Sequence, residues 1–428
     1  MSTLRTIYLI ILSTLLTLNV FCGELLERLK TLPGVVSVEE LKTTSFFAEK
    51  YLIIFEQYLD KNNPDAGTFH QRVYLSHKNF NAPVVYITEG YNADYASAEN
   101  YVNELSDILQ ANQICIEHRF FAESVPDPLD WSYLTTKAAA DDQHAIRLAF
   151  KNFYKTKWVS TGISKGGQTC LLYQMYYPKD VDATVAYVAP VAKALEDGRH
   201  EPFINNIATK KDRKKVFNFQ KEVLKRRETI LPMFESFVKA NKMTFAIPVE
   251  EIYDYCVLEY SFAFWQWIGN TEKIPSNKES DSKLFSHLVT VASPDYFSIE
   301  GSASTLPFFY QAARELGYYG YETTPLQKYL KITSAEGYFN KIFLTPEMRV
   351  DFYAQTSIDL ETFLQTKAKN TFIIYGEFDP WSAAAPDVSM NKGVTKIICP
   401  RGTHSSRIKS LPKLQHELVI NTLTGWLK

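Results

Sequence analysis

A serine between two glycines is the first feature of this sequence that could do chemistry. Ser164 lies in the order Gly162-Ile163-Ser164-Lys165-Gly166, after a short apolar run and before a segment with helical character. A Gly-x-Ser-x-Gly pattern between a strand and a helix is typical of a nucleophile elbow, a turn too tight for side chains at the two glycine positions. The pattern predicts Ser164 as a nucleophile, and a plain strand-to-helix turn is the alternative.

A histidine that follows Ser164 would be the general base, because a serine hydroxyl attacks a carbonyl carbon only when a base takes its proton. The histidines that follow are His200, His287, His404 and His416. Only His404 lies in a loop directly after a late apolar run. We therefore predict His404 as the base, and an ordinary histidine in a solvent loop is the alternative.

The acid of such a triad should leave the end of the preceding strand, where a carboxylate can hold the imidazole in one tautomer. Asp379 follows the apolar run 372–375, and Glu377 is the fallback acid. Catalysis would also need two backbone N–H groups for the oxyanion. The amide of Lys165 would be one, and the loop after the run 84–88 would supply the other from Gly90 or Tyr91.

Short apolar runs alternate with helical segments in the elements that must hold these residues. Two aromatic and β-branched segments, 50–58 and 71–76, predict an opening antiparallel pair. The later runs predict strands of a mostly parallel sheet covered by helices. These runs span residues 84–88, 114–116, 158–161, 183–188, 372–375 and 394–398.

Between about residues 195 and 350 the alternation gives way to long helical patterns rich in aromatic residues, among them 251–269 and 307–321. A helical insertion between two strands of one sheet accounts for this order better than two consecutive domains. The predicted class is therefore α/β, as an α/β-hydrolase fold with a large helical cap inserted between sheet strands. The expected parts are a signal peptide (1–22), a first hydrolase part (23–194), the cap (195–350) and a second hydrolase part (351–428).

The first 22 residues have the layout of a secretory signal, with Arg5 before an apolar stretch from Ile7 to Phe21. We expect export to the periplasm or the medium after cleavage at Cys22, with lipidation of Cys22 as the alternative. No later segment has the 18 or more consecutive apolar residues of a membrane span.

Composition narrows the partners and cofactors. Lys and Arg number 46 against 48 Asp and Glu, for a formal net charge of −2, which argues against nucleic acid as a partner. No group of residues has the spacing of metal ligands, so neither a metal nor an organic cofactor is expected. The scattered cysteines predict buried thiols, with a single disulfide left open, as is the oligomeric state. Beyond residue 22 they are Cys115, Cys170, Cys256 and Cys399.

The surroundings of the three triad residues resemble those of secreted serine peptidases related to prolyl carboxypeptidase and dipeptidyl peptidase II, and are most similar to the bacterial prolyl tripeptidyl aminopeptidase branch. The resemblance runs from about Tyr86 to Arg407. The segments that carry it are Glu89-Gly90, Glu117-His118-Arg119-Phe120-Phe121, 162–167, Asp379-Pro380-Trp381-Ser382, and Pro307-Phe308-Phe309-Tyr310-Gln311 with Glu315, Gly317, Tyr318 and Tyr319. The sequence departs at Lys165, where relatives more commonly have an aromatic residue, and at Thr88, where they often have Asn.

This resemblance implies a serine exopeptidase that acts on peptide substrates and releases short peptides, with tripeptides expected, often after proline. Trp381 would line the proline pocket, and Gln311 would be a further substrate-binding residue. Glu89 would pair with the substrate ammonium, with Glu315 or Glu322 as alternatives. An esterase or amidase on a non-peptide substrate and a catalytically silent binding protein are the competing interpretations.

Two further segments are expected to be structural. A charged triplet at a strand end, Glu117-His118-Arg119, is predicted to form a buried network and not a catalytic site. The aromatic stretch Phe262–Trp267 is predicted to belong to the core of the cap.

Overall fold

A mixed sheet forms the centre of the protein in the computed structural model, which describes residues 25–428. Within that range the sheet has nine strands, in the order β1-β2-β3-β5-β4-β6-β7-β8-β9. Strands β1, β2, β3 and β5 pair antiparallel, and all later pairs are parallel. The strands are β1 Val35–Leu41, β2 Glu49–Tyr58, β3 Thr68–His77, β4 Val84–Thr88, β5 Asn112–Ile116, β6 Trp158–Ile163, β7 Ala183–Tyr187, β8 Thr371–Gly376 and β9 Val394–Cys399.

The apolar runs of the sequence correspond to these strands because the inner parallel strands are buried on both faces. Strand β1 was not predicted. It lies at the sheet edge, where most of its side chains are partly or fully exposed, so its sequence lacks the continuous apolar run of a buried strand.

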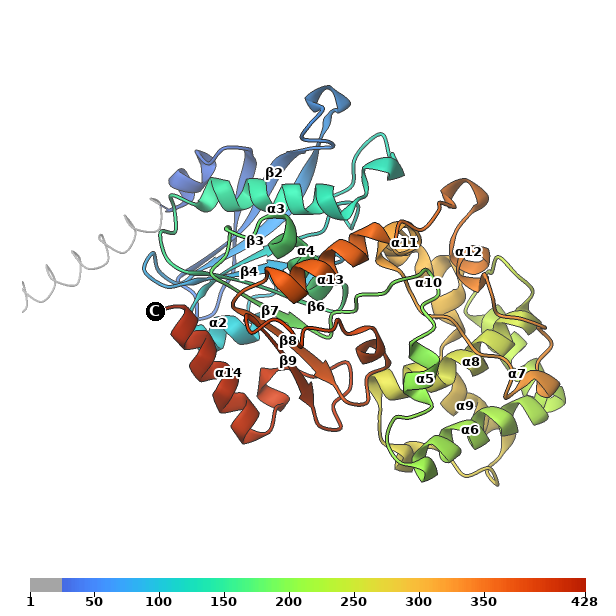
Figure 1. The fold of residues 1–428 in the computed structure, drawn as a ribbon. Coiled ribbons are helices and arrows are strands. Elements are labelled where there is room, and N and C mark those ends of the chain that lie inside the picture. The colour runs from blue at the N-terminus through green and yellow to red at the C-terminus, as the bar shows by residue number, and fades with distance from the viewer. Residues whose placement is uncertain (1–24) are drawn as a thin grey trace, which may run out of the picture.

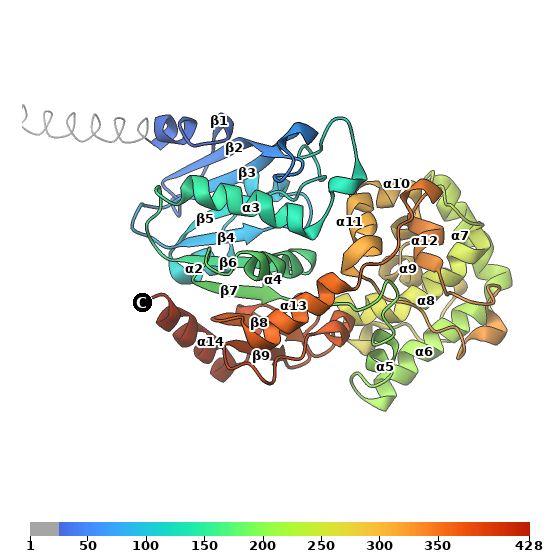
Figure 2. The ribbon, with the colours of Figure 1, turned by 45° about the horizontal axis from the view of Figure 1, so that its top comes forward.

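Helices cover both faces of the sheet (Figures 1 and 2). On one face Ile146 and Tyr173 pack in the same apolar cluster as the strand residues Tyr86 and Trp158. The inner strands also point side chains toward the other face of the sheet. There these side chains form a second apolar cluster, to which Val419 belongs. The first face is covered by α3 Thr136–Phe150, α4 Lys165–Tyr176 and α13 Gln355–Thr366, and the second by α2 Glu104–Leu109 and α14 Lys413–Trp426.

A helical cap lies between β7 and β8 in the chain and stands beside the sheet in both ribbon views (Figures 1 and 2). The fold class predicted from the sequence, an α/β-hydrolase with a helical insertion, is confirmed. The helices are α5 His200–Ile204, α6 Lys210–Lys225, α7 Arg227–Ala240, α8 Val249–Trp267, α9 Asp281–Val291, α10 Ile299–Ser302, α11 Leu306–Gln311 and α12 Tyr338–Phe343.

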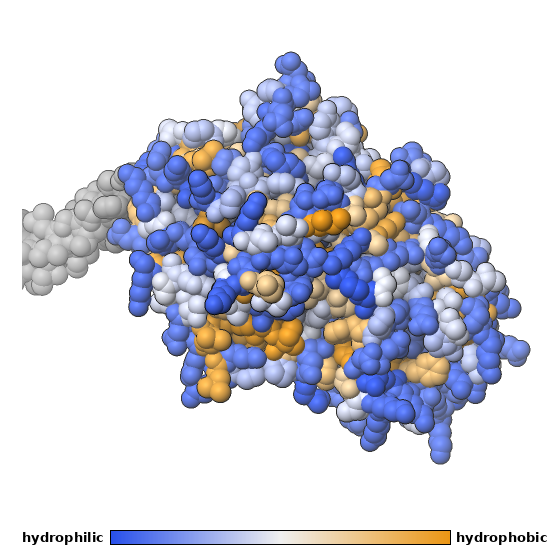
Figure 3. Space-filling view, viewed as in Figure 1, coloured by the Kyte–Doolittle hydropathy of each residue, from blue (hydrophilic) through white to orange (hydrophobic). Residues whose placement is uncertain are grey.

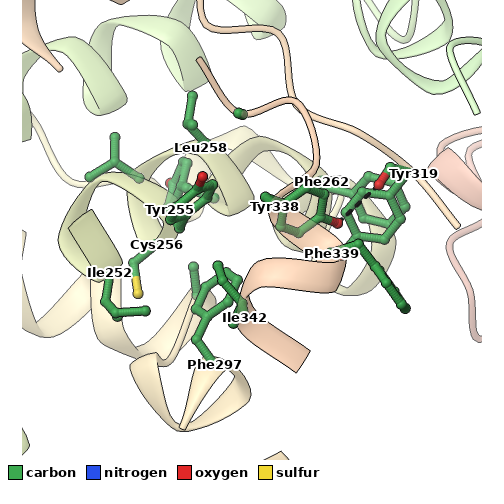
Figure 4. Packing of buried hydrophobic residues seen from close by; sticks show 14 of the residues in the cluster. Ile252, Tyr255, Cys256, Leu258, Phe262, Phe297, Tyr319, Tyr338, Phe339 and Ile342 are labelled. Carbon is green, nitrogen blue, oxygen red and sulfur yellow. Dashed lines mark hydrogen bonds between the residues drawn. The ribbon is translucent and has the colours of Figure 1, made fainter. Parts of the chain in front are cut away.

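Helix α8 is the central element of this cap. Thirteen of its residues are buried, including Phe262, Ala263, Phe264 and Trp265 of the aromatic stretch assigned to the cap core. Figure 4 shows Tyr255 of α8 among Phe297 and the α12 residues Tyr338 and Ile342. A helix that is apolar on nearly all sides is a core helix. Because α8 is buried in this way, it holds the elements that pack against it in place.

The helix predicted over 307–321 is shorter than expected. After α11 the chain makes one wider π-helical turn over Ala312–Leu316 and then leaves the helix at Gly317. Gly317 has a φ of 73°, and a Cβ there would lie 2.5 Å from the Ala194 carbonyl oxygen. The two tyrosines that follow therefore leave the helix, and Tyr319 pairs by a single β-bridge with Asp197.

The charged triplet after β5 forms a buried structural network. Arg72 binds Glu117 with one N–O distance of 2.8 Å, and the Arg119 guanidinium binds both oxygens of Asp142 at 2.7 Å. Arg119 and Asp142 are each at most 2% exposed, so this ion pair is part of the core.

The remaining structural expectations concern cysteines and the surface. The four cysteines beyond residue 22 are all free and buried. Among residues 25–428 no helix is long and apolar enough to cross a membrane. Hydrophilic side chains cover most of the face seen in Figure 3, and apolar residues form scattered patches between them.

Candidate active site

Ser164 lies in the sharp turn between β6 and α4. Its φ of 57° and ψ of −122° are a strained conformation for a residue with a side chain. A Cβ on Gly162 would lie 2.1 Å from the Gly166 carbonyl oxygen, and a Cβ on Gly166 would lie 3.0 Å from that of Thr88. The glycines are therefore required by close approach of the backbone, and the turn is held by the Ser164 N–H, which donates to the Tyr187 carbonyl at 2.8 Å.

His404 and Asp379 are brought together from the ends of neighbouring strands. Asp379 follows β8, His404 follows β9, and His404 Nδ1 lies 2.7 Å from Asp379 Oδ2. Both residues are buried. The other carboxylate oxygen accepts from the Trp381 N–H at 3.1 Å. A carboxylate fixed on both oxygens holds the imidazole with its Nδ1–H toward Asp379 and its Nε2 free to act as a base.

A cavity of about 630 Å³ lies between the ends of the strands and the cap, and both Ser164 and His404 line it. The cap contributes α8, the start of the loop after α9, and the segment after Gly317. The polar and aromatic groups in its wall include Glu89, Tyr91, Tyr95, Lys165, Gln168, Glu259, Gln266, Trp267, Tyr296, Phe308, Tyr318, Tyr319, Trp381 and Arg407.

The two predicted oxyanion donors lie at the nucleophile turn. Lys165 is the first residue of α4, and the N–H groups of a first helical turn have no partner within the helix. Gly90 packs directly against this turn, since a Cβ on it would lie 2.6 Å from the Gly166 nitrogen. The Gly90 N–H already donates to the Glu89 carboxylate, whereas Tyr91 lines the cavity, so Tyr91 is the better candidate of the two for the second N–H.

Glu89 also lines the cavity, close to the nucleophile turn. Its carboxylate accepts from the Tyr95 hydroxyl. Burial raises the pKa of Glu89, whereas the bonds from Tyr95 and the Gly90 N–H and the nearby Lys165 charge act in the opposite direction. A carboxylate at this place can bind a cationic group of a ligand.

A second carboxylate in the cavity, Glu259, was not found from the sequence. It comes from the middle of α8, where Tyr319 and Tyr321 donate to its Oε2 at 2.9 and 2.7 Å. Burial raises the pKa of Glu259 to about 7, against the two tyrosine bonds. The signal for it was a single carboxylate within the mostly apolar and aromatic run from Tyr255 to Trp267. Such a run is typical of core, and the sequence alone does not show that a cavity lies beside it.

Trp381 lies in an aromatic group on the cap side of the triad. Its ring meets those of Phe262, Tyr318 and Tyr319 edge-on, with centroids 5.3–5.4 Å apart. The rings of Phe262 and Tyr319 are stacked, with their centroids 3.7 Å apart. Figure 4 shows these two side chains next to each other. Trp381, Tyr318 and Tyr319 thus form an aromatic part of the cavity wall next to the triad.

Two other predicted substrate residues do not reach the cavity. Glu315 is buried, and its carboxylate accepts from the N–H and hydroxyl of Thr136 and from the Thr356 hydroxyl. Gln311 is also buried and is not part of the cavity wall. The alternative Glu322 lines separate hollows on the cap.

No group of three or more His, Cys, Asp or Glu side chains among residues 25–428 is arranged to hold a metal ion.

The mixed sheet carries a serine after β6, a carboxylate after β8 and a histidine after β9, and a cap is inserted before β8. This arrangement defines an α/β-hydrolase. A family model described as PS-10 peptidase S37 matches residues 22–415, and the chain belongs to this peptidase S37 family. The prediction of a serine peptidase is thereby confirmed.

One relative, found by sequence, agrees with this assignment. The chain is 31% identical over 400 residues to a prolyl tri/tetrapeptidyl aminopeptidase of Streptomyces mobaraensis. The aligned region covers 91% of this chain and 82% of the relative. Among solved structures it is similar to a proline iminopeptidase of Mycobacterium smegmatis, at 11% identity and a TM-score of 0.44 over 87% of this chain and 98% of that one. A carboxyl esterase of Bacillus coagulans has 10% identity and a TM-score of 0.39, over 92% and 100% of the two chains.

Proposed function

We propose that this peptidase is an exported aminopeptidase that releases tripeptides from the N-termini of peptides, cutting after proline, with Ser164, His404 and Asp379 as its catalytic triad. The observation that carries the proposal is Glu259, a carboxylate buried in the cap wall of the cavity that holds Ser164. The name of the Streptomyces mobaraensis relative supports the same activity.

The proposed reaction uses Ser164, His404 and Asp379 in the ordinary roles of a serine hydrolase triad. The Ser164 hydroxyl attacks the carbonyl carbon while His404 takes its proton, and Asp379 stabilises the imidazolium that forms. The N–H groups of Lys165 and of Tyr91 or Gly90 stabilise the oxyanion. His404 then gives its proton to the leaving amine, which leaves the released peptide as an ester on Ser164. Water, activated by His404, hydrolyses that ester and completes the cycle.

Selection of a free N-terminus requires an anion within the cavity at a fixed distance from the serine. Glu259 lies seven residues before Gln266 on α8, and the Gln266 carbonyl accepts from the His404 N–H at 2.9 Å. Seven residues of α-helix rise about 10 Å. Three residues of an extended peptide span about 10 Å as well. An ammonium bound by Glu259 would thus place the third peptide bond near the triad.

Preference for proline is supported by the aromatic group around Trp381. A proline ring is compact and apolar, and it has no N–H that would need a partner in such a pocket. Trp381 also lies two residues after Asp379 and its N–H donates to that carboxylate, which supports a proline pocket next to the bond to be cut.

Export is part of the proposal because residues 1–22 have the layout of a secretory signal, although they lie outside the described residues. The test is the N-terminal sequence of the protein recovered outside the cytoplasm. A start at residue 23 supports export, and retention of Met1 in the cytoplasm contradicts it.

The activity is tested with Ala-Ala-Pro linked to aminocoumarin, as the free amine and as the acetylated form, with Ser164→Ala as the control. We expect release from the free-amine substrate alone and none from the variant. Equal turnover of both forms would refute the exopeptidase assignment. Labelling of Ser164 by a fluorophosphonate without turnover of either peptide would favour an esterase or amidase.

A further inference from the structure

Lys165 has a buried side chain next to the nucleophile that the triad does not use. It is 2% exposed, and its Nζ donates to the Gly90 carbonyl oxygen at 2.5 Å. The Nζ also lies 5.6 Å from the ring centroid of Tyr91 and 5.1 Å from that of Phe121. A lysine that contacts the loop after β4 joins the two backbone segments expected to form the oxyanion hole.

The peptide unit between Gly90 and Tyr91 is the link. In a planar trans peptide the carbonyl of Gly90 and the N–H of Tyr91 point in opposite directions. The unit before it donates through its Gly90 N–H to the Glu89 carboxylate. In the unit after it, the Tyr91 carbonyl accepts from the His118 N–H at 3.1 Å. Within residues 25–428 the Tyr91 N–H donates to no other protein group, so it is free for a ligand.

We propose that Lys165 is a positioning residue for the oxyanion hole, whose ammonium or amine holds the Gly90 carbonyl and thereby turns the Tyr91 N–H toward the oxyanion. This inference rests on the proposed serine mechanism and adds to it. Gly90 needs such a hold, because glycine lets the following peptide unit rotate at little cost. A rotated unit would present a carbonyl oxygen to the oxyanion and repel it.

The surroundings of Lys165 are consistent with this structural use of its amine. Burial lowers the pKa of Lys165 well below its usual value, and the charges of Glu89 and Glu315 act against that shift. An amine donates a hydrogen bond in either protonation state, so the hold on Gly90 does not depend on charge. Glu315, predicted as a substrate residue, thus bears on the site only through its charge.

The test replaces Lys165 by methionine, which has a similar length and no N–H donor. Loss of one oxyanion donor costs on the order of 10²–10³ in kcat, so we expect a kcat loss of about a hundredfold with KM changed less than threefold. The aldehyde Ala-Ala-prolinal, which forms a tetrahedral adduct with the serine, should lose affinity in proportion to kcat/KM. The product Ala-Ala-Pro should bind as in the wild type.

Lys50→Met is the matched control. Lys50 is equally buried, and its Nζ donates to the Ala98 carbonyl at 2.5 Å, but it does not line the cavity. We expect it to leave the ratio of aldehyde to product affinity unchanged. The second variant is Lys165→Ala, measured with added n-propylamine. The amine should restore the kcat of this variant and should not raise the kcat of the wild type. Tetramethylammonium, which has no N–H, should not restore the kcat of the variant.

An unchanged kcat in Lys165→Met, or equal losses of aldehyde and product affinity, would overturn the positioning role. Failure of the proposed function itself would be seen separately, as equal turnover by the wild type and Ser164→Ala before any Lys165 variant is measured.

Discussion

The proposed role of Glu259 predicts that the selection of a free N-terminus depends on pH in a way that the chemistry of the triad does not. Burial raises the pKa of its carboxyl to about 7, so in the free enzyme Glu259 is neutral below that pH and charged above it. A substrate ammonium has an ordinary pKa of about 8 and loses its charge above that value. The attractive pair exists between the two values.

The quantity to measure is the ratio of kcat/KM for Ala-Ala-Pro-aminocoumarin to that for its acetylated form, from pH 5 to 9 at constant ionic strength. Both substrates use the same triad, so the protonation of His404 cancels in the ratio. We expect a maximum between pH 7 and 8 and a fall of about tenfold for each unit below pH 7. Above pH 8 the ratio should fall again as the substrate amine becomes neutral.

Glu259→Gln removes the charge but keeps an oxygen that can accept from Tyr319 and Tyr321. Removing one partner of a buried hydrogen-bonded charge pair costs roughly 2–5 kcal/mol. At the ordinary conversion of 1.36 kcal/mol per decade, about 3 kcal/mol corresponds to a loss of about a hundredfold in the ratio. In the Glu259→Gln variant the ratio should also become independent of pH below pH 7, because the carboxyl that titrates there is gone.

Glu201→Gln is the control for this experiment. Burial raises the pKa of Glu201 to about 7 as well, but its side chain lines a separate hollow and not the cavity of Ser164. Its charge contributes to the raised pKa of Glu259, so the variant should keep the maximum and move the acid limb slightly to lower pH. A Glu259→Gln enzyme with the wild-type ratio and pH dependence would refute the reasoning and make Glu89 the next carboxylate to test.

Three further predictions concern the triad and the core. Asp379→Asn should keep the fold but lower kcat by about 10⁴-fold, since the amide favours the wrong imidazole tautomer, and a kcat within tenfold of the wild type would contradict this role. Gly162→Ala should abolish fluorophosphonate labelling, because its Cβ would lie 2.1 Å from the Gly166 carbonyl oxygen, and full labelling would show that the turn can relax. Asp142→Asn leaves the Arg119 charge buried without its partner and should lower the free energy of unfolding by about 3 kcal/mol in a urea titration, so an unchanged midpoint would contradict a structural role for the pair.

The sheet could be predicted from the sequence because each inner strand is a short apolar run whose pattern is local. The positions of Ser164, Asp379 and His404 along the chain followed in the same way, since each comes directly after such a strand. The helix end at Gly317 was missed because the constraint on it comes from the Ala194 carbonyl, which is distant in sequence.

The cap side of the site could not be predicted by these means, and helix α8 shows why. The same helix provides Glu259 to the cavity wall and, through the Gln266 carbonyl, holds the backbone of His404. Both contacts join residues 60 or more positions apart, and nothing in the local pattern of α8 separates them from ordinary core packing. Because one helix carries Glu259 and holds the backbone of His404, the proposed function makes the length of the released peptide a property of the cap. Changes that shift α8 along its axis should therefore alter the preferred peptide length and kcat together.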